Sequence, residues 1–307
     1  MPIQPVEKVW MNGDLVPWDE AKVHVLTHAL HYGTGVFEGI RCYETARGPA
    51  VFRLVEHLRR LEHSAKIFMM EIPYSVEGLR AATIDVIRAN GLDSCYIRPI
   101  AFRGYGEMGV NPEHNPVDVT IAVWPWGAYL GDEALKNGVR MTISSWRRHD
   151  PNIIPPAAKV TGAYINSVAA KQEALHKGFD EAIMLNTAGY VSEATGENLF
   201  IVRDGEITTP PLAAGALPGI TRNSVMRIAA DLGTPVKEAM ISRSDLYLAD
   251  EMFCCGTAAE VTPVREIDGR VIGDPGPITQ AVQTKFFEVV KGVDEKYHEW
   301  LDFVQGS

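Results

Sequence analysis

The segment Arg147–Ser167, which reads R-R-H-D-P-N-I-I-P-P-A-A-K-V-T-G-A-Y-I-N-S, places one lysine, Lys159, in an apolar run bounded by prolines. Its neighbours 155–158 and Val160 carry no charge. An amine with so little water to hydrate its charged form is expected to have a lowered pKa and to act as a neutral nucleophile, for example in forming a Schiff base. An exposed loop lysine is the ordinary alternative. The rest of the chain decides between them.

Length, charge and cysteine content limit the class of protein. A chain of 307 residues with 46% hydrophobic residues is typical of two compact domains. A net charge of −10 and a pI near 5.4 argue against a nucleic-acid or anionic-membrane partner. The cysteines Cys42, Cys95, Cys254 and Cys255 form no C-x-x-C pair, which favours reduced thiols. Because neither a signal peptide nor a membrane-length apolar run is evident, we expect a cytoplasmic protein.

The first part of the chain reads as an antiparallel α+β domain, residues 1–124. Asn12-Gly13 between two short apolar runs is a strong hairpin signal. Leucines at helical spacing from Leu54 onward predict a helix with one buried face. The predicted elements are a hairpin turned at 12–13, a second hairpin turned at 47–49, helices at 54–68 and 75–90, and strands at 95–102 and 117–124.

A proline and glycines at 125–131 interrupt this pattern, so we predict an interdomain linker over 125–134 and a larger domain over 135–307. A cleft is expected beside the linker. The larger domain alternates strands with helices. Its predicted elements are strands at 139–146, 181–185 and 252–255, hairpins turned at 204–205 and 268–269, and helices at 164–177, 220–232 and 278–290.

Three further blocks accompany the lysine segment: S-E-A-T-G-E-N-L-F at 192–200, L-P-G-I-T-R at 217–222 and C-G-T-A-A-E-V-T-P at 255–263. Together the four blocks resemble the class IV pyridoxal-phosphate aminotransferases. Within that class, Y-G-T-G-V-F-E-G-I-R at 32–41, Y-I-R-P at 96–99 and M-G-V-N-P at 108–112 resemble the branched-chain amino acid aminotransferases most closely. The resemblance covers nearly the whole chain. It implies the two-domain α+β architecture known as fold type IV, with pyridoxal 5′-phosphate in the cleft between domains.

The resemblance assigns roles around the cofactor ring. Lys159 is implied as the catalytic lysine that forms the Schiff base, and Glu193 as the carboxylate that pairs with the protonated pyridine nitrogen. Glu197, in the same block, is the competing acid; the motif favours Glu193. Tyr164 matches the tyrosine that hydrogen-bonds the ring oxygen, although the start of an amphipathic helix would also place a tyrosine there.

A phosphate site is expected where L-P-G-I-T-R begins a helix, because unpaired N–H groups and the helix dipole attract an anion there. Ile220 and Thr221 would supply these groups, joined by Thr257. An ordinary helix cap has the same appearance. The resemblance adds Arg60, whose forked guanidinium suits phosphate oxygens. The position along the predicted helix does not decide whether Arg60 or its neighbour Arg59 pairs with the phosphate.

The substrate pocket is expected to combine an aromatic wall with one buried cation. The aromatic residues could equally be plain core, but Arg98, on a strand among apolar residues, needs a partner for its charge. The resemblance implies that Arg98 accepts the distal carboxylate of glutamate, that backbone N–H groups hold the α-carboxylate, and that two loops reach into the site of a dimer partner. The implied substrate-binding residues are Phe37, Tyr96, Arg98, Trp126, Tyr129, Gly196, Thr257, Ala258, Tyr32 and Val110.

No metal site is predicted. His28 and His31 are three residues apart, but no third ligand of suitable spacing accompanies them, so we interpret both as core or capping residues.

The implied activity is reversible transamination of L-leucine, L-isoleucine and L-valine with 2-oxoglutarate in ping-pong halves, a reaction of amino-acid biosynthesis carried out by a homo-oligomer built from dimers. The nearest alternatives are a D-amino acid aminotransferase, an (R)-amine aminotransferase and an aminodeoxychorismate lyase of the same class. A protein of another kind, which binds pyridoxal phosphate without turnover, is a further alternative that the expected substrate wall disfavours.

Overall fold

The computed structural model describes residues 3–127 and 130–305, which divide into two compact units. Unit 1 holds the chain up to Trp126, the short segment Ala158–Ala163, and the chain from Val289 onward. Unit 2 holds Gly127–Ala157 and Tyr164–Glu288. Within the described part of the chain no helix is long and apolar enough to cross a membrane.

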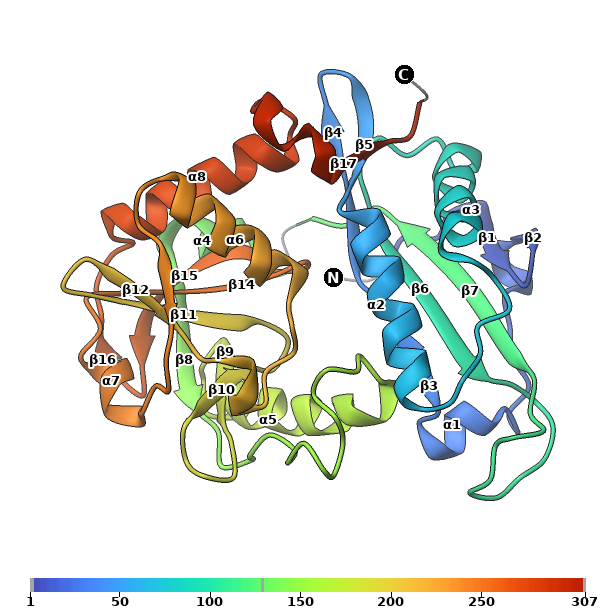
Figure 1. Ribbon diagram of the computed structural model, residues 1–307, viewed down its shortest axis with the longest axis horizontal. Coiled ribbons are helices and arrows are strands. Elements are labelled where there is room, and N and C mark those ends of the chain that lie inside the picture. Colours follow the sequence, from blue (N-terminus) through green and yellow to red (C-terminus); the bar gives the residue numbers. More distant parts are fainter. Residues whose placement is uncertain (1–2, 128–129, 306–307) are drawn as a thin grey trace. The chain divides into compact units, whose positions relative to one another are not determined.

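Among the described residues of unit 1, eight strands form one antiparallel sheet in the order β17-β5-β4-β6-β7-β1-β2, with β3 paired to β6 (Figure 1). The strands are β1 Lys8–Met11, β2 Asp14–Pro17, β3 Gly35–Phe37, β4 Ile40–Thr45, β5 Gly48–Phe52, β6 Cys95–Arg103, β7 Val117–Trp124 and β17 Leu301–Phe303. The predicted first hairpin is confirmed, since β1 and β2 pair across Asn12 and Gly13, which both have positive φ.

Helices α2 and α3 pack on this sheet. Leu54, Leu58, Leu61 and Ala65 recur on one face of α2 and are all buried. The Ser75 side chain accepts a hydrogen bond from the Gly78 amide and begins α3. The helical elements of unit 1 are α1 His28–Tyr32, α2 Leu54–Ile67 and α3 Val76–Ala89, with 3₁₀ turns η1 Trp18–Glu20, η2 Thr161–Ala163 and η4 Glu295–Trp300.

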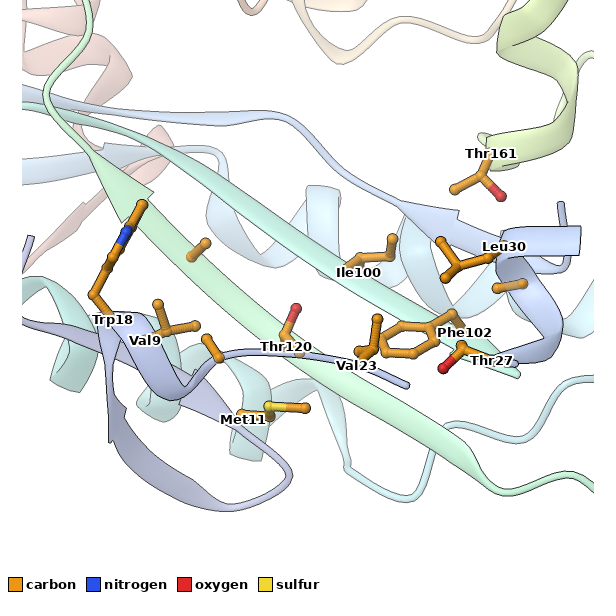
Figure 2. A pocket seen from close by; sticks show the side chains of 13 residues that line it. Val9, Met11, Trp18, Val23, Thr27, Leu30, Ile100, Phe102, Thr120 and Thr161 are labelled. Atoms are coloured by element: carbon orange, nitrogen blue, oxygen red, sulfur yellow. The ribbon is translucent and has the colours of Figure 1, made fainter. Parts of the chain in front are cut away.

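Unit 1 contains an apolar pocket of about 530 Å³ (Figure 2). Val9, Ile100 and Phe102 line it from β1 and β6, and Leu30 lines it from α1. Leu30 is 63% exposed, so part of this apolar lining faces solvent.

Among the described residues of unit 2, nine strands form a mixed sheet in the order β10-β9-β8-β15-β14-β11-β12-β13, with β16 paired to β15. Strand β8 runs parallel to both β9 and β15. The strands are β8 Val139–Ile143, β9 Glu181–Leu185, β10 Val191–Ala194, β11 Asn198–Arg203, β12 Glu206–Thr209, β13 Val236–Glu238, β14 Glu251–Gly256, β15 Glu260–Ile267 and β16 Arg270–Val271.

The helices of unit 2 follow the predicted segments closely. Helices were expected at 164–177, 220–232 and 278–290, and they occur within one residue of those limits. The helical elements are α4 Asp132–Asn137, α5 Tyr164–His176, α6 Ile220–Asp231, α7 Arg243–Tyr247, the 3₁₀ turn η3 Leu212–Ala214 and α8 Pro277–Val290, whose last two residues belong to unit 1. The predicted strand at 139–146 is shorter, because β8 ends at Ile143.

The division into units differs from the predicted domains in three places. The end of the chain joins unit 1 because β17 pairs with β5. The lysine segment joins unit 1 because Val160 bridges to Val36 and the Phe37 amide donates to the Lys159 carbonyl oxygen at 3.0 Å. The predicted linker, 125–134, ends inside α4.

Candidate active site

Lys159 is fixed in unit 1 through its main chain. Its carbonyl oxygen accepts from the Phe37 amide at 3.0 Å, and its own amide donates to Ser64 Oγ at 3.0 Å. The flanking Ala158 and Val160 are buried, while Lys159 is half-buried. Its Nζ atom lies 4.9 Å from the centroid of the Phe37 ring. The lysine is therefore held between β3 and α2 with its amine against an aromatic face.

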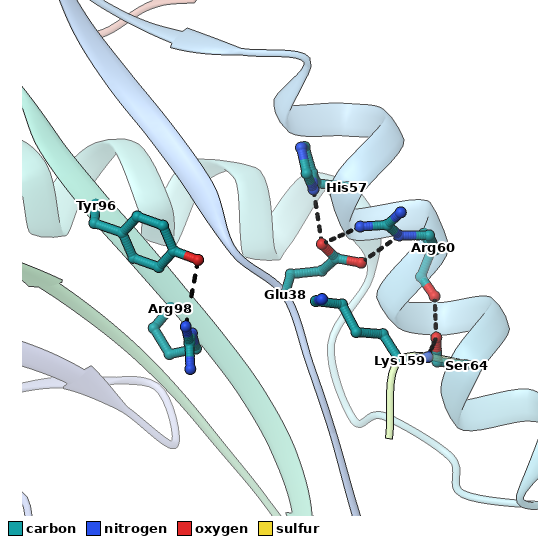
Figure 3. A network of polar contacts seen from close by, with 7 residues as sticks. All are labelled: Glu38, His57, Arg60, Ser64, Tyr96, Arg98 and Lys159. Atoms are coloured by element: carbon teal, nitrogen blue, oxygen red, sulfur yellow. Dashed lines mark hydrogen bonds and ion pairs between the residues drawn. The ribbon is translucent and has the colours of Figure 1, made fainter. Parts of the chain in front are cut away.

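A polar network surrounds Glu38, the residue after β3 (Figure 3). Arg60 donates to its carboxylate from Nε at 2.7 Å and from Nη2 at 2.8 Å, and His57 Nδ1 lies 2.7 Å from Oε2. Glu38 is fully buried. Burial alone raises a carboxyl pKa, but the Arg60 charge and the His57 and Arg60 hydrogen bonds hold the pKa of Glu38 well below its usual range. Burial also lowers the pKa of His57, which favours its neutral form.

The predicted aromatic wall and Arg98 come together in unit 1. The rings of Tyr96 and Trp126 have centroids 4.2 Å apart. The Arg98 guanidinium lies 4.9 Å from the Phe37 centroid and donates to the Tyr96 hydroxyl at 3.3 Å. Its Nε atom is buried and makes no hydrogen bond among the residues that the structure describes. Tyr129, the remaining predicted member of the wall, lies outside the described residues.

Glu193, on β10 in unit 2, is held as a paired carboxylate. Its side chain is 7% exposed and its Oε1 atom accepts from Arg148 Nη2 at 2.6 Å. Oε2 accepts from the Leu217 amide at 2.9 Å and from Asn198 Nδ2 at 3.3 Å. A carboxylate has about four lone-pair sites, so Glu193 retains capacity for a further donor such as a protonated ring nitrogen.

Glu197 has a different environment from Glu193. It is buried, and the Gly196 amide donates to its Oε2 atom at 3.1 Å. The Lys171 ammonium pairs with Glu181 instead, at 2.7 Å. Burial, together with the nearby Glu181 carboxylate, raises the pKa of Glu197 to about 8. A glutamate protonated at neutral pH is poorly suited to balance a pyridinium charge, which favours Glu193 for that role.

The start of α6 offers an anion cradle. Its N-cap residue, Gly219, makes no side-chain cap hydrogen bond, so no side chain of the cap competes for the first amides of the helix. A Cβ atom at Gly219 would lie 2.0 Å from Asn198 Oδ1, so the cradle requires glycine at this position. Ile220 and Thr221 begin the helix and are buried.

The G-T-A block forms a turn directly after β14. A Cβ atom at Gly256 would lie 3.2 Å from the Gly196 carbonyl oxygen, so the absence of a side chain lets this block approach the S-E-A-T-G-E block. Thr257 and Ala258 occupy the turn. Tyr164 begins α5 and is half-buried.

The residues present fit pyridoxal phosphate. This cofactor requires an amine, a carboxylate and an anion site, and the chain offers the half-buried Lys159, the paired Glu193 and the uncapped start of α6.

The predicted dimer-reaching residues are exposed. Tyr32 is 43% exposed and Val110 is 89% exposed.

The two histidines of α1 make hydrogen-bonding contacts within unit 1. The ring nitrogens of His28 lie 2.8 Å from Thr34 Oγ1 and 2.7 Å from the Gly109 carbonyl oxygen, and His31 contacts the Val25 carbonyl oxygen. Across 3–127 and 130–305, no group of three or more His, Cys, Asp or Glu side chains is placed to hold a metal ion.

Sequence reasoning missed four residues that the structure places beside the predicted ones: Glu38, His57, Ser64 and Arg148. A signal existed for one of them, because His57 lies three positions before the predicted Arg60 and therefore shares a face of α2 with it. The structure also separates the two arginines of that helix, since Arg60 joins the Glu38 network while Arg59 is exposed.

Comparison with known proteins agrees with this geometry. Residues 35–267 match the amino-transferase class IV family, and the chain belongs to that family. It is 50% identical over 307 residues to a branched-chain-amino-acid aminotransferase of Escherichia coli strain K12, covering 99% of each chain. It is also 50% identical over 299 residues to the Pseudomonas aeruginosa enzyme of that name, covering 97% of each.

Solved structures give the same result. The crystal structure of the Escherichia coli branched-chain amino acid aminotransferase aligns with a TM-score of 0.96 at 51% identity, covering 98% of this chain and all of that one. The T.th. branched-chain amino acid aminotransferase with pyridoxamine 5′-phosphate aligns with a TM-score of 0.95 at 52% identity, covering 99% of this chain and all of that one. The class IV fold expected from the sequence is confirmed.

Proposed function

We propose that this protein is a branched-chain amino acid aminotransferase that exchanges an amino group between L-leucine, L-isoleucine or L-valine and 2-oxoglutarate. The near full-length identity to curated enzymes of that name supports this activity. The observation that carries the substrate assignment is the placement of Arg98 among Phe37, Tyr96 and Trp126. One pocket then offers apolar surface for an aliphatic side chain and a cation for a carboxylate.

Pyridoxal phosphate, when bound, supplies the electron sink and carries the amino group between the two half-reactions. We assign two roles to Lys159 Nζ: it would hold the cofactor covalently, and as a free amine it would take the proton from the substrate α-carbon. The Phe37 and Ser64 hydrogen bonds to its main chain fix where that amine can reach.

The remaining cofactor roles follow from charge and geometry. Glu193, kept in place by Arg148, would balance a protonated ring nitrogen. The α6 start at Ile220 and Thr221, with Thr257, would hold the phosphate, and Arg60 would add a charged donor. The Tyr164 hydroxyl would donate to the ring oxygen.

We assign two binding modes to the substrate site. A branched aliphatic side chain packs on Phe37, Tyr96 and Trp126, where burying apolar area is favourable. The distal carboxylate of glutamate pairs with Arg98, whose Nε lacks a hydrogen-bond partner among the described residues. Backbone amides at Thr257 and Ala258 hold the α-carboxylate common to both substrates, and Gly196 lies beside them with its own amide donating to Glu197.

We propose that the protein acts as a homo-oligomer built from dimers in the cytoplasm. Exposed apolar side chains support a self-association surface: Val25 is 72% exposed, Leu30 63% and Val110 89%. A second copy covers this surface and the neighbouring pocket, and the Tyr32 and Val110 segments contact it. The four cysteines are free and buried, as suits a reducing compartment. The mass measured by light scattering on a sizing column tests the oligomeric state.

The experiment that tests the function is a comparison of amino donors. Purified protein with pyridoxal phosphate and 2-oxoglutarate should form glutamate from L-leucine, L-isoleucine and L-valine, and only weakly from D-alanine or (R)-1-phenylethylamine. A preference for either of the latter would assign the protein to another branch of the family. Cofactor binding without glutamate formation from any donor would contradict the proposed activity.

Arg98→Leu tests the two binding modes. Loss of a charge-assisted pairing should cost glutamate and 2-oxoglutarate about 1.5–3 kcal/mol in kcat/KM. L-leucine should be affected much less, because its side chain does not need the cation. Stopped-flow measurement of each half-reaction gives both values, and equal losses for glutamate and leucine would make Arg98 a structural charge only.

A further inference from the structure

We propose that Glu38 is a positioning residue for cofactor binding: with His57, it orients the Arg60 guanidinium toward the phosphate of pyridoxal phosphate. This inference rests on the proposed function, because it takes that phosphate as the anion. It assigns a role to a buried carboxylate that the reaction itself does not use.

The Arg60–Glu38 pair has a defined geometry. Arg60 donates to Glu38 through Nε at 2.7 Å and Nη2 at 2.8 Å, which is a two-point contact along one edge of a planar group. Fixing one edge of a guanidinium fixes the direction of the opposite edge. The edge that carries Nη1 therefore points away from Glu38 in one defined direction.

Glu38 is fully buried and the Arg60 side chain is only 11% exposed. A buried carboxylate is costly unless it is paired and hydrogen-bonded, and here the Arg60 pair and His57 Nδ1 satisfy it. An arginine side chain has many rotamers, and restricting it to one of them costs entropy. Because the Glu38 pair restricts Arg60 before the ligand binds, this cost does not weaken binding.

Ser64 connects this network to the main chain of Lys159. Ser64 lies one helical turn after Arg60 on α2; its hydroxyl donates to the Arg60 carbonyl oxygen at 2.8 Å and accepts from the Lys159 amide at 3.0 Å. Figure 3 shows the Lys159 amine directed toward Glu38. The same helix face thus sets the place of Arg60 and of Lys159.

Electrostatics alone predicts the opposite effect for Glu38. A carboxylate near a phosphate repels it, so a variant lacking this charge would bind the cofactor more tightly if orientation were unimportant. Positioning predicts weaker binding. Glutamine at this site keeps the shape but offers one acceptor and one donor group to three N–H donors, so it cannot reproduce the contacts of Glu38.

The test compares two ligands on the full-length chain freed of cofactor: pyridoxal 5′-phosphate and pyridoxal, which lacks the phosphate. Glu38→Gln should raise the Kd of pyridoxal 5′-phosphate roughly tenfold or more and change the Kd of pyridoxal less than about threefold. In an Arg60→Gln background, adding Glu38→Gln should raise the Kd of pyridoxal 5′-phosphate by less than about a further twofold, because Glu38 acts through Arg60. Equilibrium dialysis gives all these constants.

Two further variants keep the test decisive. Glu251→Gln removes another buried carboxylate, one that accepts from the Thr279 amide at 2.7 Å in unit 2, and serves as the matched control, with both Kd values unchanged. If Glu38→Gln does not fold, Glu38→Asp replaces it: the charge stays but the shorter arm misplaces Arg60, and the same phosphate-specific loss is expected.

Three results would overturn the proposal: unchanged or tighter binding of pyridoxal 5′-phosphate, equal losses for both ligands, or a full loss in the Arg60→Gln background. Failure of the proposed function gives a different pattern, in which the wild-type chain itself does not prefer pyridoxal 5′-phosphate to pyridoxal.

Discussion

Glu193 and Glu197 lie in one motif, S-E-A-T-G-E, and both are buried, yet their partners differ. Glu193 pairs with Arg148 at 2.6 Å and accepts from two further donors. Glu197 accepts from the Gly196 amide and lies near a second carboxylate, that of Glu181. Burial is therefore shared, and the neighbouring charge determines which acid is suited to hold a cationic ring.

The largest expected effect comes from Glu193→Gln, which removes the charge that balances the pyridinium. The half-reaction with L-leucine should slow by at least about 3 kcal/mol, roughly 150-fold, while circular dichroism shows a retained fold. Single-turnover absorbance measurements give the rate. A near wild-type rate, combined with a slow Glu197→Gln variant, would reverse the comparison.

A smaller effect is expected from Arg148→Met, which leaves Glu193 without its cation. Losing a charge-assisted hydrogen bond should cost the same half-reaction on the order of 1.5–3 kcal/mol. Arg148→Lys keeps the charge and should recover part of the rate. If Arg148→Met matches the wild type, then Arg148 does not explain why the two glutamates differ.

The smallest effect on rate is expected from Glu197→Gln, below about 0.5 kcal/mol at neutral pH, because glutamine resembles a protonated glutamate. The larger effect of this variant is expected in the pH dependence of the free energy of unfolding. With a folded pKa of about 8 against an ordinary 4.5, Glu197 holds a proton between those pH values that the unfolded chain has released. The stabilisation is complete below the ordinary pKa and is lost as pH rises through 8.

Over that window the wild-type free energy of unfolding should fall with pH by up to about 1.4 kcal/mol per pH unit more steeply than that of Glu197→Gln. Urea unfolding between pH 5 and 8 measures both slopes, with Glu251→Gln as the control for a buried glutamate elsewhere. Parallel profiles would mean that Glu197 carries no extra proton.

Local signals predicted the elements well. Asn12-Gly13 sets a hairpin, Ser75 caps a helix, and the leucine spacing from Leu54 marks a buried helix face, all through contacts a few residues apart. Strand β17 was missed because it is three residues long and depends on β5, far away in the sequence. The membership of 158–163 in unit 1 has the same cause, a pairing with β3 that no local pattern contains.

The candidate site shows the same limit. Motifs led to the prediction of Lys159 and Glu193 as site residues, because each stands in a block of distinctive composition. The partners of these residues come from elsewhere in the chain: Arg148 reaches Glu193 across 45 positions, and Glu38 meets Arg60 across 22. A buried charge in a sequence signals that a partner exists but does not identify it.

The most direct test of the account is the attachment point of the cofactor. Purified protein should be yellow, and borohydride reduction followed by peptide mapping should place the pyridoxyl group on Lys159, with Lys159→Ala still binding pyridoxal phosphate but losing turnover almost completely. A pyridoxyl group on any other lysine, or full turnover in Lys159→Ala, would contradict it.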